Sequence, residues 1–116
     1  MMKSPSAGQI TAKKGVSAET IEKFIRQESR KYGVNPEIAV FVAYKESQYH
    51  LDTLGDSGHS RGLYQISDIY HPEISDECAF SLQCSTRFFM KQVLAGKLSE
   101  WSTWRLRDKL YADAIN

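Results

Sequence analysis

The sequence predicts a mainly α, single-domain protein with one long buried central helix and at most a very short β element. Three observations lead to this fold class. The chain has 116 residues, which is enough for one hydrophobic core. Hydrophobic residues make up 41% of it and charged residues 25%, close to the globular average. Apolar residues recur at the three- and four-residue spacing of helices, in segments bounded by cap residues and glycines.

Residues 1–16 are polar and lack the apolar run of a secretory signal, so they are interpreted as a flexible N-terminal arm. The domain is expected to span residues 17–116. Its first helix begins after Ser17, a cap residue, and ends at Gly33, a residue suited to the left-handed cap conformation.

Asn35, Pro36 and Glu37 form the cap, first position and first-turn acid of a second helix that runs to about Ser47. Its apolar run from Ile38 to Tyr44 is continuous, so this helix is expected to be buried on most sides.

Residues 48–66 are predicted to form a loop, with a short strand or extended segment at 63–66. Ser67 or Asp68 is expected to cap a single turn before Pro72. A third long helix is predicted from about Ser81 to Gly96, with Leu82, Phe88, Phe89, Val93 and Leu94 directed inward. A last helix is predicted over residues 102–114, with Trp104, Leu110 and Ala114 packed.

Charge and hydropathy exclude two classes of partner. Fifteen basic and fourteen acidic residues leave a formal net charge of +1, too little for a typical duplex-DNA binder. The longest apolar run has seven residues and cannot span a bilayer. Neither a nucleic-acid partner nor membrane insertion is therefore expected, and a monomer is expected.

Polar chemistry is concentrated in residues 46–77, which hold seven acidic side chains and a single base, Arg61. The segment is either a solvated acidic loop region or the place where the function lies, since loops on a rigid scaffold often carry function. Its three histidines, His50, His59 and His71, are spaced by nine and twelve residues, so no zinc or other metal site is predicted.

Glu46 lies at the end of the predicted buried helix, on the face that carries Ala39, Val42 and Ala43. An apolar setting and the negative end of the helix dipole would both raise the pKa of its carboxyl, as a general acid for glycosidic cleavage requires. The alternative is an ordinary exposed acid in a last helical turn.

The segment from Glu46 onward resembles the lysozyme-like superfamily of peptidoglycan-cleaving enzymes, meaning lytic transglycosylases with an SLT domain and goose-type lysozymes. The residues that carry the resemblance are Glu46-Ser47, then Gly55-Asp56-Ser57-Gly58-His59-Ser60-Arg61-Gly62-Leu63-Tyr64-Gln65-Ile66. The resemblance covers roughly residues 17–104 and implies a lysozyme-like fold. It assigns the role of catalytic acid to Glu46 and implies that Gln65 lines the saccharide cleft.

Asp56 is the second catalytic candidate, because goose-type enzymes have an acid at the matching Gly-Asp position that holds the hydrolytic water. Asp also occurs in such turns simply to bond the backbone. Goose-type enzymes have a further acid where this sequence has Ser67, with Asp68 one residue later. This difference favours the transglycosylase route over the two-acid hydrolytic one.

Ser47, Tyr64 and Gln65 are the predicted substrate-binding residues. Ser47 would orient Glu46 or contact substrate, although a serine at a helix end is commonly a terminal polar group. Tyr49, Tyr64 and Tyr70 could each stack on a sugar ring or pack in the core, and Tyr64 is preferred because it lies within the motif.

Cys78 and Cys84 could be two buried thiols or a short-loop disulfide. The substrate implied by the resemblance lies outside the cytoplasm, which favours the disulfide and an extracytoplasmic location: periplasmic, secreted or phage-released.

The sequence therefore predicts an enzyme that cleaves peptidoglycan glycan strands between N-acetylmuramic acid and N-acetylglucosamine, without a cofactor. Lytic transglycosylase chemistry is preferred. A two-acid muramidase and a non-catalytic lysozyme-like module that binds cell wall remain alternatives, and a nucleic-acid-binding helical domain has only the basic excess of residues 1–31 in its favour.

Overall fold

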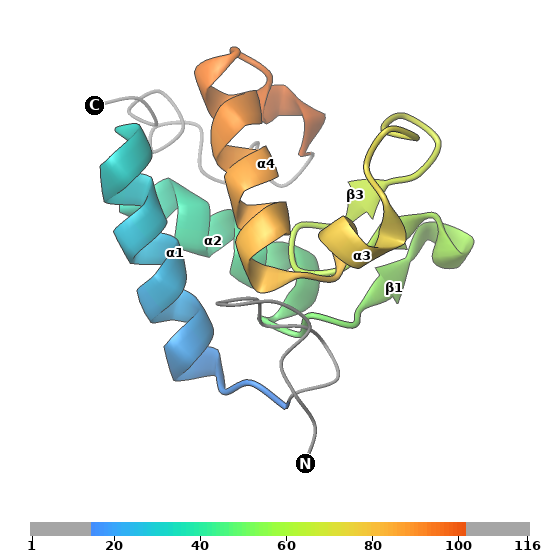
Figure 1. Cartoon of the computed structure of the whole chain (residues 1–116), viewed down its shortest axis with the longest axis horizontal. Coiled ribbons are helices and arrows are strands. Elements are labelled where there is room, and N and C mark those ends of the chain that lie inside the picture. The colour runs from blue at the N-terminus through green and yellow to red at the C-terminus, as the bar shows by residue number, and fades with distance from the viewer. Residues whose placement is uncertain (1–14, 102–116) are drawn as a thin grey trace.

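The computed structural model describes residues 15–101, a small mainly helical domain with one three-stranded antiparallel sheet (Figure 1). The mainly α fold class is therefore confirmed. The elements are α1 (Ala18–Tyr32), α2 (Pro36–Ser47), β1 (Leu54–Gly55), η2 (Asp56–Gly58), β2 (Ser60–Arg61), β3 (Ile66–Ser67), α3 (Asp76–Ala79), α4 (Leu82–Leu94) and η3 (Leu98–Glu100).

The predicted cap residues delimit the first two helices. The Ser17 hydroxyl accepts a hydrogen bond from the Thr20 N–H, and Gly33 ends α1 in the left-handed region at φ +75°. Asn35 accepts from the N–H of Glu37 at the start of α2. These contacts depend only on neighbouring residues, which is why the sequence predicts both boundaries.

Helix α2 is enclosed by the rest of the domain, as its apolar run predicts. Ile38, Ala39, Val40, Val42 and Ala43 are buried. Helix α1 packs against both α2 and α4, and Figure 1 shows α1 and α4 as neighbouring helices. Burial of these aliphatic residues supplies the hydrophobic free energy that holds the layers together.

One charged residue lies in this helical interface. The carboxylate of Glu28 in α1 is almost fully buried. It accepts a hydrogen bond from Arg87 Nε in α4 at 3.1 Å and forms an ion pair with Lys31 Nζ at 3.3 Å. The pairing offsets the desolvation of the carboxylate and links the two helices.

The β structure comprises three strands of two residues each, in the order β1-β2-β3. Leu54 pairs with Arg61, and Ser60 pairs with Ser67. The sequence predicted one short extended segment at 63–66, but residues 62–65 form the turn that joins β2 to β3. The predicted position was therefore wrong in detail, although the expectation of very little β structure was right.

The short helix α3 was not predicted, and it leads into α4 through Ser81, whose hydroxyl caps α4 by accepting from the Cys84 N–H. Cys78 and Cys84 form a disulfide between α3 and the first turn of α4, which confirms the favoured pairing. A loop this short contributes about 2 kcal/mol in the loop-entropy model.

Of the remaining expectations, one is wrong and two are untested. Leu94 was expected to face inward, but it is exposed at the last residue of α4. The N-terminal arm before residue 15 and the last helix at 102–114, with Trp104, lie outside the described residues. No helix within residues 15–101 has the length and apolarity that crossing a bilayer requires.

Gly62, in the turn that joins β2 to β3, lies very close to the backbone of α3 at Ala79. Its φ is +78°, and a Cβ at this position would collide with the carbonyl oxygen of Ala79. The turn that joins β2 to β3 can therefore lie against α3 only if residue 62 is a glycine.

We expect Gly62→Ala to lower the free energy of unfolding by about 3 kcal/mol, because the left-handed backbone cost and the steric overlap add. Gly96→Ala is the matched control, since φ there is +79° and nothing lies within 4 Å of a Cβ. It should cost only about 1 kcal/mol. Urea unfolding followed by circular dichroism measures both, and equal losses would contradict the close approach.

Candidate active site

Glu46 continues the buried face of α2 to the point where that face meets solvent. Ala39, Val42 and Ala43 on this face are fully buried, while Glu46 is partly exposed. The hydroxyl of Tyr64 donates to the backbone oxygen of Ala39 at 2.9 Å, so this face is covered by the turn between β2 and β3. Glu46, seven residues after Ala39, continues this face of the helix. It is not among the residues that line the pocket described below.

Ser47 does not contribute a side chain to an open site. It is almost fully buried, and its hydroxyl donates to the backbone oxygen of Ala43 at 3.0 Å. This bond within the helix satisfies the hydroxyl locally. The structure therefore does not support a contact of Ser47 with substrate, and the alternative that Ser47 orients Glu46 stays a prediction.

The prediction that Tyr64 stacks on a sugar is wrong. Tyr64 has no exposed surface, and its ring stacks on that of Phe89 with 4.2 Å between centroids and 9° between planes. Its backbone oxygen accepts a 2.6 Å hydrogen bond from the indole nitrogen of Trp101. Because its ring and polar groups are used internally, Tyr64 belongs to the core that supports the site.

Gln65 lines an open pocket, in agreement with its expected place at a cleft. Its amide nitrogen donates to the backbone oxygens of Thr53 at 3.0 Å and Gly62 at 2.9 Å. Its Oε1 lies against Gly55, where any Cβ would collide with it. The side chain is thus held by the loop before β1 and the turn after β2, and both hydrogens of its Nε2 are used within the protein.

Asp56 is exposed at the start of η2, in the turn that joins β1 to β2. It and Ser57 both have positive φ, at 51° and 56°. This conformation is unusual for residues other than glycine, although Asp tolerates it better than most. Asp56 is therefore accessible, and its position depends on a strained turn.

All five non-glycine residues with positive φ in the described chain fall between residues 48 and 65: Gln48, Tyr49, Asp56, Ser57 and Gln65. Each such residue costs of order 1 kcal/mol or more and persists only where the surrounding structure enforces it. Strain of this kind gathers at functional sites. The segment that follows Glu46 and ends at Gln65 is the strained part of this molecule.

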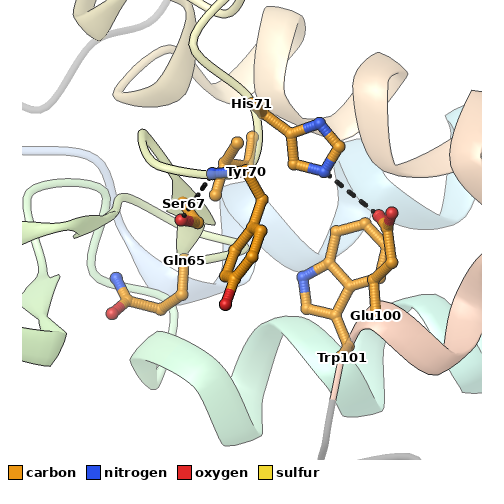
Figure 2. A pocket seen from close by; sticks show the side chains of 7 residues that line it. Gln65, Ser67, Tyr70, His71, Glu100 and Trp101 are labelled. Atoms are coloured by element: carbon orange, nitrogen blue, oxygen red, sulfur yellow. Dashed lines mark hydrogen bonds and ion pairs between the residues drawn. The ribbon is translucent and has the colours of Figure 1, made fainter.

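The pocket beside Gln65 has a volume of about 290 Å³. Figure 2 shows the ring of Tyr70 between Gln65 and Trp101, and His71 above Trp101 and Glu100. The remaining lining residues are Ile66 and Ser67. The pocket combines aromatic rings with amide, hydroxyl, imidazole and carboxylate groups, a set that suits a polar ligand with apolar faces.

Tyr70 is the aromatic residue that is available to a ligand. It is 80% exposed, whereas Tyr64 is buried. The Ser67 hydroxyl accepts from the N–H groups of Ile69 and Tyr70 and so forms the turn that presents Tyr70. Ser67 therefore caps this turn, while the Asp68 carboxylate pairs with His59 Nδ1 at 2.9 Å.

Tyr49 follows the helix that carries Glu46, and its hydroxyl donates to the backbone oxygen of Val40. Burial raises the pKa of Tyr49 to about 12. The phenol therefore stays protonated at neutral pH and is neither a base nor a nucleophile there.

Arg61 anchors the loop that bears Tyr70 and His71. Its Nε donates to the backbone oxygen of Ile66 at 3.1 Å, and its Nη1 donates to that of Ile74 at 2.9 Å, so the side chain closes both ends of residues 66–74. The Asp76 carboxylate accepts a further bond from Nη1 at 2.9 Å. Arg61 is only 3% exposed, and its Nη2 has no partner among the described residues.

The sequence offered Tyr70 as one of three candidate stacking residues but favoured Tyr64, and it did not assign Arg61, His71, Glu100 or Trp101 to this pocket. Arg61 did give a signal, because it is the single base in an acidic stretch. The others come together only through the loop after β3 and through η3, which the sequence does not relate to one another.

The three histidines are not gathered in one place. His59 pairs with Asp68, while His71 lies between Glu73 and Glu100. Among residues 15–101, no three His, Cys, Asp or Glu side chains are grouped so that they could hold a metal ion.

Comparisons of the chain with protein-family models, with curated proteins and with solved structures returned no match.

We expect Arg61→Lys to reduce the free energy of unfolding by about 2–3 kcal/mol, because one ammonium cannot bond both ends of the loop and the buried oxygens lose a charged donor. Arg26→Lys is the control: Arg26 bridges Glu22 and Glu37 near the surface, where ion pairs contribute less than about 1 kcal/mol. Amide hydrogen exchange over residues 67–75 should accelerate in Arg61→Lys alone. Unchanged exchange in this loop would contradict the anchoring role.

Proposed function

We propose that this protein cleaves peptidoglycan glycan strands between N-acetylmuramic acid and N-acetylglucosamine, with Glu46 as the catalytic acid. One observation carries the proposal. Glu46 ends the buried face of α2 that Tyr64 contacts. Gln65, the residue that follows Tyr64 in the chain, lines the open pocket. The Gly-Leu-Tyr-Gln motif, which follows Glu-Ser in the order that lysozyme-like enzymes have, is thus bonded through Tyr64 to the helix that carries Glu46.

The strained backbone supports an active site rather than a plain structural turn. Positive φ values at Gln48, Tyr49, Asp56, Ser57 and Gln65 follow Glu46 directly and extend to the pocket. A domain without a function in this segment would gain stability from glycine at such positions.

The pocket supports a saccharide as the ligand. Sugar rings have apolar faces that stack on aromatic side chains and hydroxyl edges that require hydrogen-bonding partners. Tyr70 offers the first kind of surface, while Gln65, Ser67 and Glu100 offer the second. The disulfide supports a location where thiols are oxidised, which is where peptidoglycan lies.

The proposed reaction begins when the Glu46 carboxylic acid donates its proton to the glycosidic oxygen. The bond between this oxygen and C1 of N-acetylmuramic acid breaks, and positive charge develops on the ring. The 6-hydroxyl of the same sugar then attacks C1, and its proton passes to the Glu46 carboxylate. The product is a 1,6-anhydro sugar, and the acid is regenerated without a cofactor.

This route is preferred to hydrolysis because its nucleophile is already attached to the substrate, so proximity replaces much of the help that a second carboxylate would give. Ser67 stands where goose-type enzymes have an acid, and its hydroxyl is used to cap the turn before Tyr70.

We expect Glu46→Gln to reduce the clearing of purified cell walls by 10²-fold or more, because the amide keeps the shape of the side chain but cannot donate the proton. Glu37→Gln is the matched control, the same change at the exposed opposite end of the same helix. Both variants should keep the wild-type circular dichroism spectrum. Undiminished clearing by pure Glu46→Gln would reject the role of this residue, and sacculus binding without clearing by the wild type would favour the non-catalytic module.

The products are expected to end in 1,6-anhydro sugars, and Asp56→Asn is expected to cost less than tenfold in rate. Asparagine keeps much of the capacity of Asp56 to bond the backbone of its turn and tolerates positive φ. Mass spectrometry of muropeptides after digestion distinguishes the products by the loss of one water. Ordinary reducing ends together with an inactive Asp56→Asn variant would instead indicate a two-acid muramidase.

A further inference from the structure

His71 joins the two walls of the pocket. Its Nδ1 lies 3.2 Å from Oε2 of Glu73, which is in the same loop, and its Nε2 lies 3.2 Å from Oε1 of Glu100 in η3 (Figure 2 draws the second contact). The imidazole therefore connects the loop of residues 67–75 to η3. Both segments line the pocket, through Tyr70 and His71 on one side and through Glu100 and the adjacent Trp101 on the other.

The number of hydrogens on the imidazole decides whether both contacts can exist. Carboxylates are acceptors, so each ring nitrogen of His71 must carry a hydrogen for both to be hydrogen bonds. A neutral imidazole has one N–H and a cation has two. Without the second hydrogen, one nitrogen lone pair would face a carboxylate oxygen at 3.2 Å, which is repulsive.

We propose that His71 is a proton-dependent positioning residue, whose cationic form holds the loop of residues 67–75 against η3 and whose neutral form releases one of the two. No other group has to move for this release, because the contacts with Glu73 and Glu100 are both made by the same imidazole ring.

The groups around the imidazole are compatible with this role. Glu73 and Glu100 are the carboxylates that face it, and the charge of Lys97 also acts on Glu73. From α4, the ring of Phe88 packs edge-on at 4.9 Å between centroids, and Gln92 donates to Glu100 at 2.8 Å. Because Gln92 would still bond Glu100 after the histidine lost its proton, the Glu100 contact can be broken without leaving Glu100 unpaired.

Glu73 remains charged over the range in which histidines titrate. A hydrogen bond from its own backbone N–H lowers the pKa of the Glu73 carboxyl, and the bond to His71 lowers it further. The proton that switches the contact therefore belongs to the imidazole, and histidine is the side chain that ordinarily changes charge between pH 5 and 8.

The consequence for a ligand follows from the position of Tyr70, which precedes His71 in the loop and projects over the pocket. When His71 is charged, Tyr70 and Trp101 are held at a fixed separation. When it is neutral, the loop can move away from η3 and the pocket widens. Ligand affinity should therefore fall as the pH rises. The choice of a saccharide as the ligand rests on the proposed function, whereas the switch itself does not.

The switch can be tested without a ligand by long-range proton–nitrogen NMR of the imidazoles between pH 5.5 and 8. We expect both ring nitrogens of His71 to be protonated at pH 5.5. The backbone amide signals of Tyr70 and Glu100 should move with its titration. His59, which pairs with Asp68 through Nδ1, is the internal comparison and should leave these amides unaffected. A neutral His71 at pH 5.5, or amides that do not follow its titration, would overturn the proposal.

The binding test uses N-acetylglucosamine oligomers and the Glu46→Gln background, in which the ligand is not cleaved. Affinity should be about tenfold weaker at pH 8 than at pH 5.5, the equivalent of one charge-assisted hydrogen bond. Glu100→Gln and His71→Gln should each abolish this pH dependence. Glu77→Gln, the same charge change on the exposed face of α3, should retain it.

The outcomes separate the switch from the enzyme. If the oligomers bind with the same affinity at both pH values, or if Glu100→Gln keeps the pH profile of its parent, the positioning role is rejected. If they bind at neither pH, the proposed substrate is rejected, and the imidazole and amide signals still decide the switch. Should His71→Gln fail to fold, Glu100→Gln provides the same test, because it removes only the carboxylate that receives the Nε2 bond.

Discussion

The buried side chain of Tyr64 connects the parts of this structure that are distant in sequence. Its hydroxyl donates to the Ala39 oxygen in α2, its ring stacks on Phe89 in α4, and its backbone oxygen accepts the Trp101 indole. One residue in a short turn thus contacts the central helix α2, helix α4 and Trp101, which directly follows η3. A buried phenol is tolerated because its hydroxyl has a partner, and the ring supplies a large apolar surface to the core.

This arrangement relates the core to the candidate site. Because Tyr64 points inward, its neighbour Gln65 points to the pocket, and its positive φ of 52° makes the chain turn sharply between the two. The face of α2 that Tyr64 covers ends at Glu46. The position of the proposed acid relative to the pocket therefore depends on the packing of a buried residue that does not itself line the pocket.

The loop after β3 shows how a small domain holds a pocket-lining segment that has little regular structure. Arg61 closes the base of the loop with uncharged backbone acceptors and Asp76, and His71 joins its outer part to η3. The guanidinium cannot lose its proton under ordinary conditions, whereas the imidazole can. The bonds from Arg61 to the backbone oxygens therefore do not depend on a histidine proton, whereas the attachment of the outer part does.

The amino-acid sequence alone was enough to predict the features that depend on neighbouring residues. The caps of Ser17, Asn35 and Ser81 and the left-handed Gly33 each act within three residues, and the apolar run of α2 predicted its burial. The tertiary structure decided which tyrosine is in the core and which is exposed, since Tyr64 and Tyr70 have the same side chain and similar local surroundings. It also decided the partners of Arg61 and His71, because hydrogen bonds between distant segments exist only after the helices and the sheet have packed.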